Sequence, residues 1–286
     1  MDSMNKDKVR LILQQHFPQT KWNISLPDDG QHKASYIAQS DELQVFIKFD
    51  VPIEAIQRLS EIQVAPPLVA SGLYEGSSYV VQEYITGRYP DWRWFANHLP
   101  YLATFMKCYH SDDHLVSLLA RTMTTNYAEH VASDLATLET QFNSLNADML
   151  HASKFVRAFE MLKNQAHTLC SDTLVPVHPD PNTKNVLLVD TRLKMVDWNN
   201  LQLSDPMRDA GLLLWWYVSP KQWPIFFQAY SLVLDENLVN RIYWWAARSS
   251  FAIALWHVEH EFDCTDFLQD FIAALNKLDN PRAAFQ

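Results

Sequence analysis

The alternation of apolar and polar positions divides the chain into a strand-rich first third and a helical remainder. Between residues 3 and 17, apolar residues recur at helical spacing, which predicts an amphipathic helix that ends before Pro18. Short apolar runs separated by turn residues then follow, and this pattern is typical of β-strands. We predict one inserted helix from about residue 52 to residue 63, and strands over residues 22–26, 34–39, 43–49, 68–73 and 78–84.

Beyond Thr86-Gly87 the strand-like alternation gives way to helical periodicity, which continues to the C-terminal region apart from one hairpin-like segment. We therefore expect an α+β protein with two lobes. The N-terminal lobe, residues 1–86, would hold a small antiparallel sheet and end in a hinge. The larger C-terminal lobe, residues 87–286, would be mainly helical. Its clearest helical stretches are residues 101–110, 127–145 and 152–170.

A tight β-hairpin is predicted inside the helical part. The apolar runs 186–189 and 193–196 flank a polar turn, which is a hairpin signature. If Thr191 is the centre of that turn, the same register extended by one residue places Asn185 opposite Asp197. Directly opposed residues have Cα atoms about 4.5–5.5 Å apart.

The side chains at the open end of this hairpin suit a metal-dependent reaction. An amide oxygen on Asn185 and a carboxylate on Asp197 can together bind one hard divalent cation, for which Mg²⁺ is the natural candidate. Asp180, on the loop just before the hairpin, is free to reach a substrate hydroxyl. The competing interpretation is that these polar side chains only cap turns at the rim of a hairpin.

Composition and charge narrow the class of protein. Apolar residues make up 48% of the chain and charged residues 20%, which fits a globular protein with a sizeable core. No segment resembles a signal peptide or is long enough to span a membrane, and three cysteines without metal-binding spacing fit a reducing cytoplasm. The net charge of −10 argues against nucleic acid as a partner and favours a cationic small molecule.

Three linked motifs carry a resemblance to a known family. The spacing His178-x-Asp180-x4-Asn185 is followed by VDW at residues 196–198 and by DPMRD at residues 205–209. This series resembles HGDxxxxN, (I/V)D(W/F) and DPxxD of the aminoglycoside phosphotransferase and choline kinase family. The resemblance implies a protein-kinase-like two-lobed fold. It also implies ATP- and Mg²⁺-dependent transfer of a phosphoryl group to a hydroxyl on a small molecule.

The resemblance assigns a role to each motif residue. Asp180 would be the catalytic residue, orienting the acceptor hydroxyl and taking its proton late. Asn185 and Asp197 would bind Mg²⁺, which neutralises charge on the nucleotide phosphates. His178 would support the loop by hydrogen bonding, and Asp209 would brace the same loop from the following helix.

Residues of the first lobe resemble the phosphate-binding part of such kinases. Lys48, in VFIKFD, resembles the lysine that holds nucleotide phosphates, and Glu54 in the following helix resembles its ion-pair partner, with Glu61 as a rival. Ser35 would replace a side-chain donor often found near the phosphates. Two plainer interpretations remain open: Lys48 as a solvated lysine on an edge strand, and Glu54 as a carboxylate favoured by the helix dipole.

The run SYVVQEYITG resembles the hinge strand of these kinases. The resemblance would place the adenine edge against the backbone of Gln82, Glu83 and Ile85. Because a hinge reads the base mainly through backbone groups, ATP and GTP both remain open as donors.

Two departures from the family pattern keep a second function open. The nucleotide-covering segment DDGQHKAS offers only Gly30, and the glycine that usually follows the motif histidine is Pro179 here. Both features favour the alternative of a nucleotide-binding pseudokinase with a regulatory or binding role. Among acceptors, a choline-like amino alcohol, an aminoglycoside-type antibiotic and another metabolite all stay open, as does the oligomeric state.

Ten tryptophans are unusual for a chain of 286 residues, and most of them fall in the helical part. A few rings could form a cage for a quaternary ammonium such as choline. Packing between helices is the competing interpretation, and for any single ring the sequence favours it. An acidic stretch after Trp256 is open in the same way, between a face for a cationic acceptor and a solvated helix face. It contains Glu259, Glu261, Asp263 and Asp266.

Overall fold

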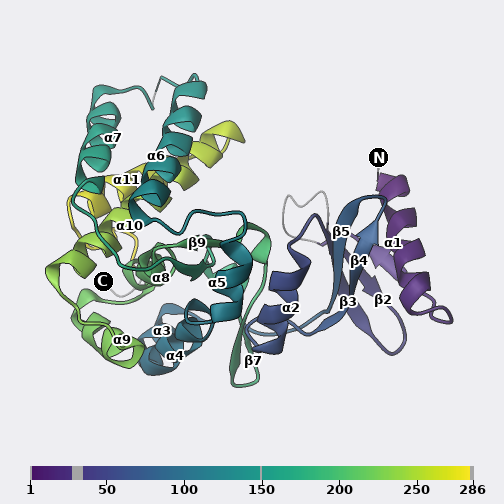
Figure 1. Cartoon of the computed structure of the whole chain (residues 1–286). Helices are drawn as coiled ribbons and strands as arrows, with labels where there is room; N and C mark the ends of the chain where they lie inside the picture. The colour runs from purple at the N-terminus through teal and green to yellow at the C-terminus, as the bar shows by residue number, and fades with distance from the viewer. Residues whose placement is uncertain (1, 28–34, 149, 284–286) are drawn as a thin grey trace. The chain divides into compact units, whose positions relative to one another are not determined.

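The computed structural model describes residues 2–27, 35–148 and 150–283 (Figure 1). The chain forms two compact units, of which the first comprises Met1–Tyr89 and Lys184–Asn200, and the second comprises Pro90–Thr183 and Leu201–Gln286. The first boundary falls close to the predicted end of the N-terminal lobe at residue 86. The hairpin differs from expectation, because it groups with the strand-rich unit and not with the lobe predicted over residues 87–286.

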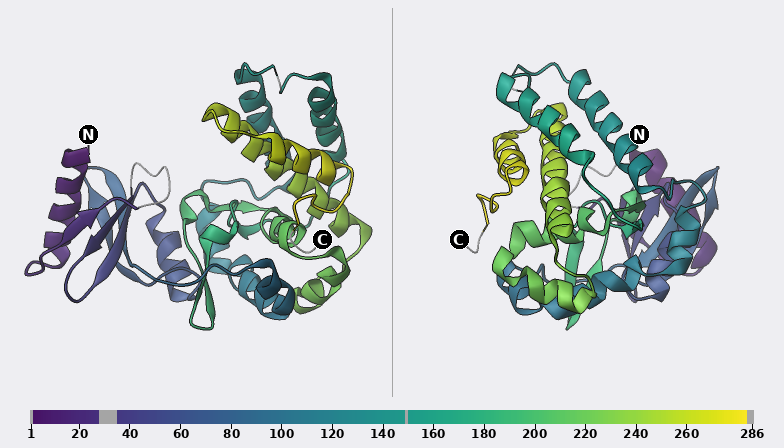
Figure 2. Two further views of the ribbon diagram at one scale, coloured as in Figure 1. Left: turned by 180° about the vertical axis from the view of Figure 1, so that it is seen from behind. Right: turned by 60° about the vertical axis from the view of Figure 1, so that its left-hand side comes forward.

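The first unit contains the predicted five-stranded sheet. All neighbouring strands are antiparallel, and the strand order is β1-β2-β3-β5-β4. The helix α1 covers one face of the sheet, as both views of Figure 2 show. The elements of this part are α1 (Asp2–His16), β1 (Asn23–Ser25), β2 (Ser35–Gln39), β3 (Gln44–Phe49), α2 (Ile53–Glu61), β4 (Leu68–Tyr74) and β5 (Ser77–Glu83).

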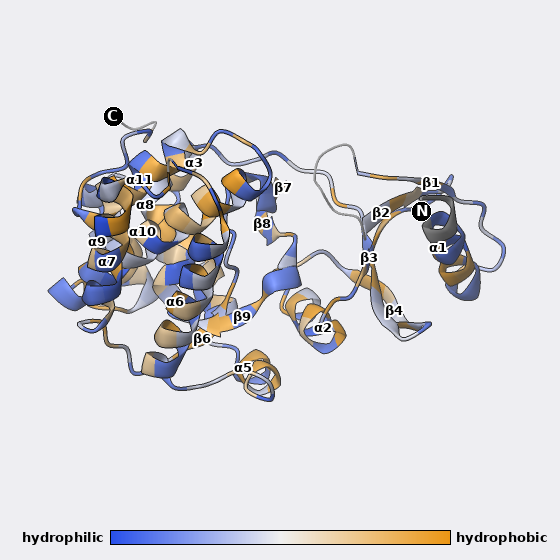
Figure 3. Ribbon diagram, turned by 90° about the horizontal axis from the view of Figure 1, so that it is seen from above, coloured by the Kyte–Doolittle hydropathy of each residue, from blue (hydrophilic) through white to orange (hydrophobic). Residues whose placement is uncertain are grey.

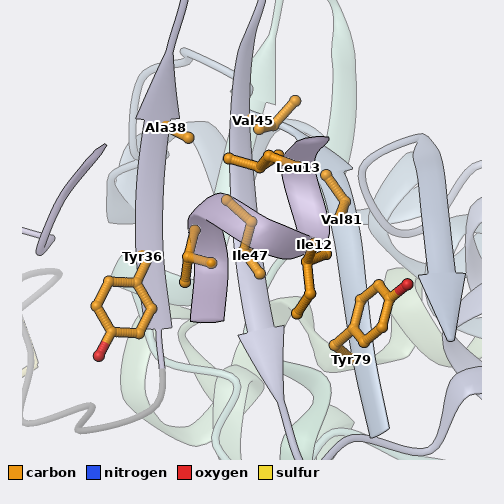
Figure 4. Packing of buried hydrophobic residues seen from close by; sticks show 9 residues of the cluster. Ile12, Leu13, Tyr36, Ala38, Val45, Ile47, Tyr79 and Val81 are labelled. Atoms are coloured by element: carbon orange, nitrogen blue, oxygen red, sulfur yellow. The ribbon is translucent and has the colours of Figure 1, made fainter. Parts of the chain in front are cut away.

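The hydrophobic core of the first unit lies between α1 and the sheet. Alternate residues of a strand point to the same face, so the strands present one continuous apolar surface to the helix. Ile12 and Leu13 of α1 are fully buried against this surface (Figure 4). Val9 of the same helix is fully buried as well. Their sheet partners are Tyr36, Ala38, Val45, Ile47, Tyr79 and Val81.

The substitution Ile12→Ala is expected to lower the free energy of unfolding by about 2–5 kcal/mol, because it removes a buried side chain and leaves a cavity. Ile12 is 0% exposed, whereas its neighbour Leu11 is 52% exposed. Leu11→Ala is therefore the matched control and should change stability by less than about 0.5 kcal/mol. Urea denaturation followed by circular dichroism measures both, and equal effects of the two variants would contradict this packing.

The second unit is mainly helical, as predicted. Hydrophobic residues are concentrated along α8 and α10 (Figure 3). Within the described ranges, every helix is either too short or too polar to traverse a lipid bilayer. The helices of the second unit are α3 (Trp92–Asn97), α4 (Leu99–His110), α5 (Asp113–Leu119), α6 (Tyr127–Ser144), α7 (Ser153–Ala166), α8 (Ala210–Tyr217), α9 (Trp223–Tyr230), α10 (Glu236–Glu259) and α11 (Thr265–Leu275). In the same unit, β6 (Val175–Val177) pairs with β9 (Gln202–Ser204).

The tryptophans of the helical unit mostly pack in its core. Trp215, Trp223 and Trp244 are buried, and each indole N–H donates a hydrogen bond to a backbone carbonyl. Trp245 is also buried, with the guanidinium of Arg208 5.1 Å from its ring centre. These four rings are core residues, which confirms the packing interpretation for them.

A buried group of charges links α6 and α10 to the segment after β9. Asp134 accepts hydrogen bonds from Arg208 at 2.8 Å and from Arg248 at 2.5 and 2.9 Å. His130 lies one helical turn before Asp134 and places its Nε2 2.7 Å from the Ser204 hydroxyl. Burial, followed by the positive charge of Arg208, lowers the pKa of His130 below its usual value of 6.5.

This shift predicts a loss of stability in acid. Because the folded pKa of His130 is lowered, the unfolded chain binds the proton first, and folding loses stability as the pH falls through 6.5 toward the folded pKa. The variant His130→Gln removes this contribution. Urea midpoints measured at pH 5 and pH 7.5 should therefore differ less for the variant than for the wild type, and an unchanged difference would argue against the shift.

Candidate functional site

The hairpin is present, but its register differs from the prediction by one residue. Strands β7 (Val186–Val189) and β8 (Arg192–Met195) pair with Val186 opposite Met195. The turn therefore holds only Asp190 and Thr191, and Arg192 is part of the strand. The predicted placement of Asn185 opposite Asp197 is wrong, because the Asn185 carbonyl accepts a hydrogen bond from the amide of Val196 at 2.9 Å.

The reason for the tighter turn is the backbone of Asp190, which has a φ of 54°. Asp tolerates this left-handed conformation, and two-residue hairpin turns require it. A change of register by one residue normally moves a side chain to the other face of the ladder. The register therefore does not place Asn185 and Asp197 opposite each other on one face.

Asp197 is directed by its own backbone and not by the strand ladder. Its φ is 65°, so the chain turns out of the strand direction at this residue. The Asp197 carboxylate meets the ammonium of Lys48, with Nζ and Oδ1 2.5 Å apart. The first unit thus brings together two predicted site residues that are 149 positions apart in the sequence.

Lys48 lies on β3 and is only 7% exposed, so it is not a solvated lysine on an edge strand. The sheet places it opposite Ser35 on one side and Val80 on the other, on the face turned away from α1. A charge buried to this degree needs a partner of opposite sign, and Asp197 supplies it.

The predicted partner of Lys48, Glu54, lies in the first turn of α2, where a carboxylate is favoured by the helix dipole. Its rival Glu61 accepts hydrogen bonds from Gln57 at 3.0 Å and Arg58 at 3.2 Å. The ion pair described for Lys48 is with Asp197, and a pair with Glu54 stays a prediction.

Ser35 occupies the first position of β2, directly across from Lys48. Its side chain is fully buried, and its hydroxyl has no hydrogen-bond partner among the described residues. Leaving a buried hydroxyl unsatisfied costs about 1–3 kcal/mol, so such a group beside an ammonium is suited to a ligand that accepts hydrogen bonds. The glycine-poor segment before it, including Gly30, lies outside the described residues.

The predicted hinge begins at the end of β5, which lies between β3 and β4 in the sheet. The Gln82 side chain donates to the carbonyl of Pro66 at 3.1 Å, and the Glu83 amide donates to that of Pro67 at 2.9 Å. Ile85 lies two residues beyond the end of β5, outside the paired part of the strand. Contact of this segment with an adenine stays a prediction.

The residues after the hinge bind the hairpin. Arg88 and Leu188 form an isolated antiparallel bridge, with N–O distances of 3.2 and 2.8 Å between their backbones. A Cβ atom on Gly87 would lie 2.9 Å from the Leu188 carbonyl oxygen, so only glycine allows this close approach. This backbone contact explains why the hairpin belongs to the strand-rich unit.

In the second unit, Asp209 is the central acceptor of a buried network. Its Oδ2 accepts from the Tyr109 hydroxyl at 2.8 Å, from the backbone amide of His178 at 3.0 Å, and contacts His110 Nε2 at 3.1 Å. Its Oδ1 caps α8 through the Ala210 amide at 2.6 Å. Asp209 thus braces the loop that carries Asp180, as predicted.

The loop itself is held by local hydrogen bonds. His178 is buried, and its Nδ1 accepts from the amide of Asp180 at 3.3 Å. The amide group of Asn182 donates to Asp180 Oδ1 at 2.8 Å. These contacts confirm that His178 supports the loop. The exposed carboxylate of Asp180 belongs to the second unit, whereas Asn185 and Asp197 belong to the first.

Asp205 is the centre of a second hydrogen-bond network in this unit. Asp205, the first residue of DPMRD, caps the segment that follows it by accepting from the Met207 amide at 2.8 Å. It also receives two hydrogen bonds from Arg241, at 2.7 and 2.6 Å, and one from the Tyr127 hydroxyl at 2.7 Å. An arginine within the apolar stretch of α10 was the available signal, because a buried guanidinium requires a carboxylate.

The two predicted metal ligands have the chemistry that Mg²⁺ prefers. Among the described residues, no three His, Cys, Asp or Glu side chains gather as a metal centre. Mg²⁺ is commonly held by only one or two protein oxygens together with phosphates and water. The carboxylate of Asp197 and the amide of Asn185 are hard oxygen donors of this kind, so the predicted ligands fit the ion.

Comparison with known proteins adds independent evidence. A sequence model described as the phosphotransferase enzyme family matches residues 54–238. The structure is similar to that of choline kinase LicA from Streptococcus pneumoniae, with a TM-score of 0.66 and 14% identity over 95% of this chain and 98% of that chain.

It is also similar to the AMP-bound complex of spectinomycin phosphotransferase APH(9)-Ia, with a TM-score of 0.65 and 12% identity over 95% of this chain and 97% of that chain. The choline kinase from Cryptosporidium parvum Iowa II gives a TM-score of 0.64 and 13% identity over 95% of both chains. These similarities confirm the predicted α+β, protein-kinase-like fold.

Proposed function

Because this chain belongs to the phosphotransferase enzyme family, we propose that it is an ATP- and Mg²⁺-dependent kinase acting on a hydroxyl of a small molecule. The observation that carries the proposal is the partly buried ion pair between Lys48 and Asp197. Phosphoryl transfer depends on positioning and charge neutralisation. In this pair the ammonium could bind phosphate, and the carboxylate could bind Mg²⁺, in place of each other.

Each described group would contribute one part of that chemistry. Lys48 would hold phosphate oxygens, and the buried hydroxyl of Ser35 beside it would donate a hydrogen bond to the same ligand. Asn185 and Asp197 would hold Mg²⁺, which neutralises phosphate charge when bound. Asp180, on a loop fixed by His178 and Asp209, would orient the acceptor hydroxyl and accept its proton.

The acceptor and the compartment follow from the similar structures, the net charge and the cysteines. The similar structures include choline kinases and phosphotransferases named for spectinomycin, and one is a complex with kanamycin. The net charge of −10 favours an acceptor that carries positive charge, such as an amino alcohol or an aminoglycoside. All three cysteines are free thiols, which agrees with the cytoplasm as the expected location.

A pseudokinase remains the second candidate because Pro179 stands in place of the usual glycine in the loop of Asp180. Both functions predict nucleotide binding, but only a kinase releases ADP. The deciding experiment measures ADP release from MgATP, and GDP release from MgGTP, across a panel of choline, ethanolamine, spectinomycin and kanamycin. Reactions with EDTA in place of Mg²⁺ serve as the control.

We expect acceptor-dependent ADP release that is abolished by EDTA. Thermal stabilisation by MgADP without turnover of any acceptor would favour the pseudokinase. An absence of both turnover and nucleotide-dependent stabilisation would contradict the proposed function in either form.

A further inference from the structure

The turn that follows α2 presents three consecutive carbonyl groups to strand β8. The Lys194 ammonium donates to the carbonyl of Gln63 at 2.7 Å and lies 3.5 Å from that of Ala65. Between them, the Val64 carbonyl accepts from the backbone amide of Met195 at 2.8 Å. The amides of the same turn donate back into α2, so its carbonyls point away from the helix.

Gln63 gives this turn its shape, because its φ is 61°. A non-glycine residue in the left-handed region persists only where the surroundings fix it. Lys194 supplies that fixation, since one ammonium can satisfy two carbonyls that would otherwise face outward. The neighbouring Arg192 differs, because it is exposed and donates to the side chain of Gln63, at 3.2 Å, and not to the backbone of the turn.

This contact connects the elements that carry Lys48 and Asp197. Strand β3 carries Lys48 and leads directly into α2, and the turn that follows α2 is tied to Lys194. Three residues after Lys194 the chain reaches Asp197, which returns to Lys48. The position of the Asp197 carboxylate is therefore set by the ion pair at one end and by the lysine contact at the other.

We propose that Lys194 is a positioning residue, which places Asp197 for metal and nucleotide binding by fixing β8 to the turn after α2. The proposal rests on the proposed kinase function and adds to it a residue that need not touch the nucleotide. Burial, with Arg192 as the second cause, lowers the pKa of Lys194, which agrees with an ammonium partly withdrawn from water.

The test compares Lys194→Met with Lys194→Arg, which can still donate to carbonyls. Losing this contact should raise the KM for MgATP about tenfold, which corresponds to about 1.4 kcal/mol. The KM for the acceptor should stay within about twofold. Lys194→Arg should restore most of the affinity for MgATP, and the matched control Arg192→Met should leave it within about twofold.

A purely structural role would give a different result. The core variant Ile12→Ala lowers stability without touching the hairpin, and it provides the reference. If Lys194→Met changed the KM for MgATP no more than Ile12→Ala did, or if Lys194→Arg failed to restore it, the positioning role would be overturned.

Hydrogen exchange separates this proposal from the proposed function. In the protein without nucleotide, Lys194→Met should accelerate exchange of the Met195 amide, which donates to Val64, relative to Arg192→Met. Faster exchange would support the role of Lys194 in fixing β8 to the turn after α2, even if the wild type turned over no MgATP. Unchanged exchange at Met195 would overturn this role of Lys194 even in a fully active enzyme.

Discussion

We expect Asp180→Asn to lower kcat for phosphoryl transfer by about 10²–10⁴-fold, the usual contribution of a general base. Asparagine keeps the size of the side chain and an oxygen that can accept from Asn182. The loop should therefore stay in place, because its other hydrogen bonds use the backbone amides of His178 and Asp180. The KM for MgATP should change less than about threefold.

Steady-state ADP release at saturating acceptor measures this effect. Asp172→Asn is the matched control, because Asp172 is an exposed aspartate of the same unit, eight positions earlier in the chain. The control should retain wild-type kcat. An Asp180→Asn variant with undiminished kcat would show that Asp180 is not the general base, although the protein would still be a kinase.

The second large effect is expected for Asp197→Asn. Losing the carboxylate removes a predicted Mg²⁺ ligand and should reduce kcat/KM for MgATP by about 10²–10³-fold. It also leaves the Lys48 ammonium, only 7% exposed, without its partner. The free energy of unfolding should therefore fall by about 1–3 kcal/mol.

The double variant Lys48→Met/Asp197→Asn separates these two consequences. Replacing the buried ammonium by an apolar side chain should recover much of the lost stability, because no uncompensated charge remains. Activity should not recover. Urea denaturation and calorimetric titration of ADP with and without Mg²⁺ provide the two readouts. A double variant less stable than Asp197→Asn alone would contradict the role assigned to the pair.

The spacing of apolar residues and the positions of turn residues were sufficient to predict the secondary structure of the first unit. Every strand predicted there is present, because each apolar run is bounded by residues that end strands. The short helices α3 and α5 fall in the region predicted to be mainly helical but were not placed individually, and the strands β6 and β9 were not predicted. Elements of three to seven residues carry too few periodic positions to stand out from loops.

The hairpin shows where local reasoning stops. Its existence and both strands followed from the sequence, but its register depended on the backbone of one residue, Asp190. A turn of two residues and a turn of three both suit the sequence Asp190-Thr191-Arg192, and only the φ of Asp190 distinguishes them. Register errors of this kind displace every side chain that is placed by counting along the ladder.

The partners of buried charges were the hardest features to predict. The sequence resemblance identified Lys48 and Asp197 separately, and their contact across 149 positions came only from the fold. The contact of Lys194 with the turn after α2 could not be predicted from the sequence, because its acceptors are backbone carbonyls. Asp209 was predicted because its motif lies in a fixed order with the loop that it holds.

The backbone bridge between Arg88 and Leu188 also bears on how the molecule is made. The strand-rich unit is discontinuous in the chain, and its last piece is Lys184–Asn200. A nascent chain that has emerged only as far as residue 89 lacks the counter-ion of Lys48 and the donors for the turn after α2. This unit can therefore reach its final form only after about two thirds of the protein has left the ribosome, so cleavage at the hinge would not release it as an intact fragment.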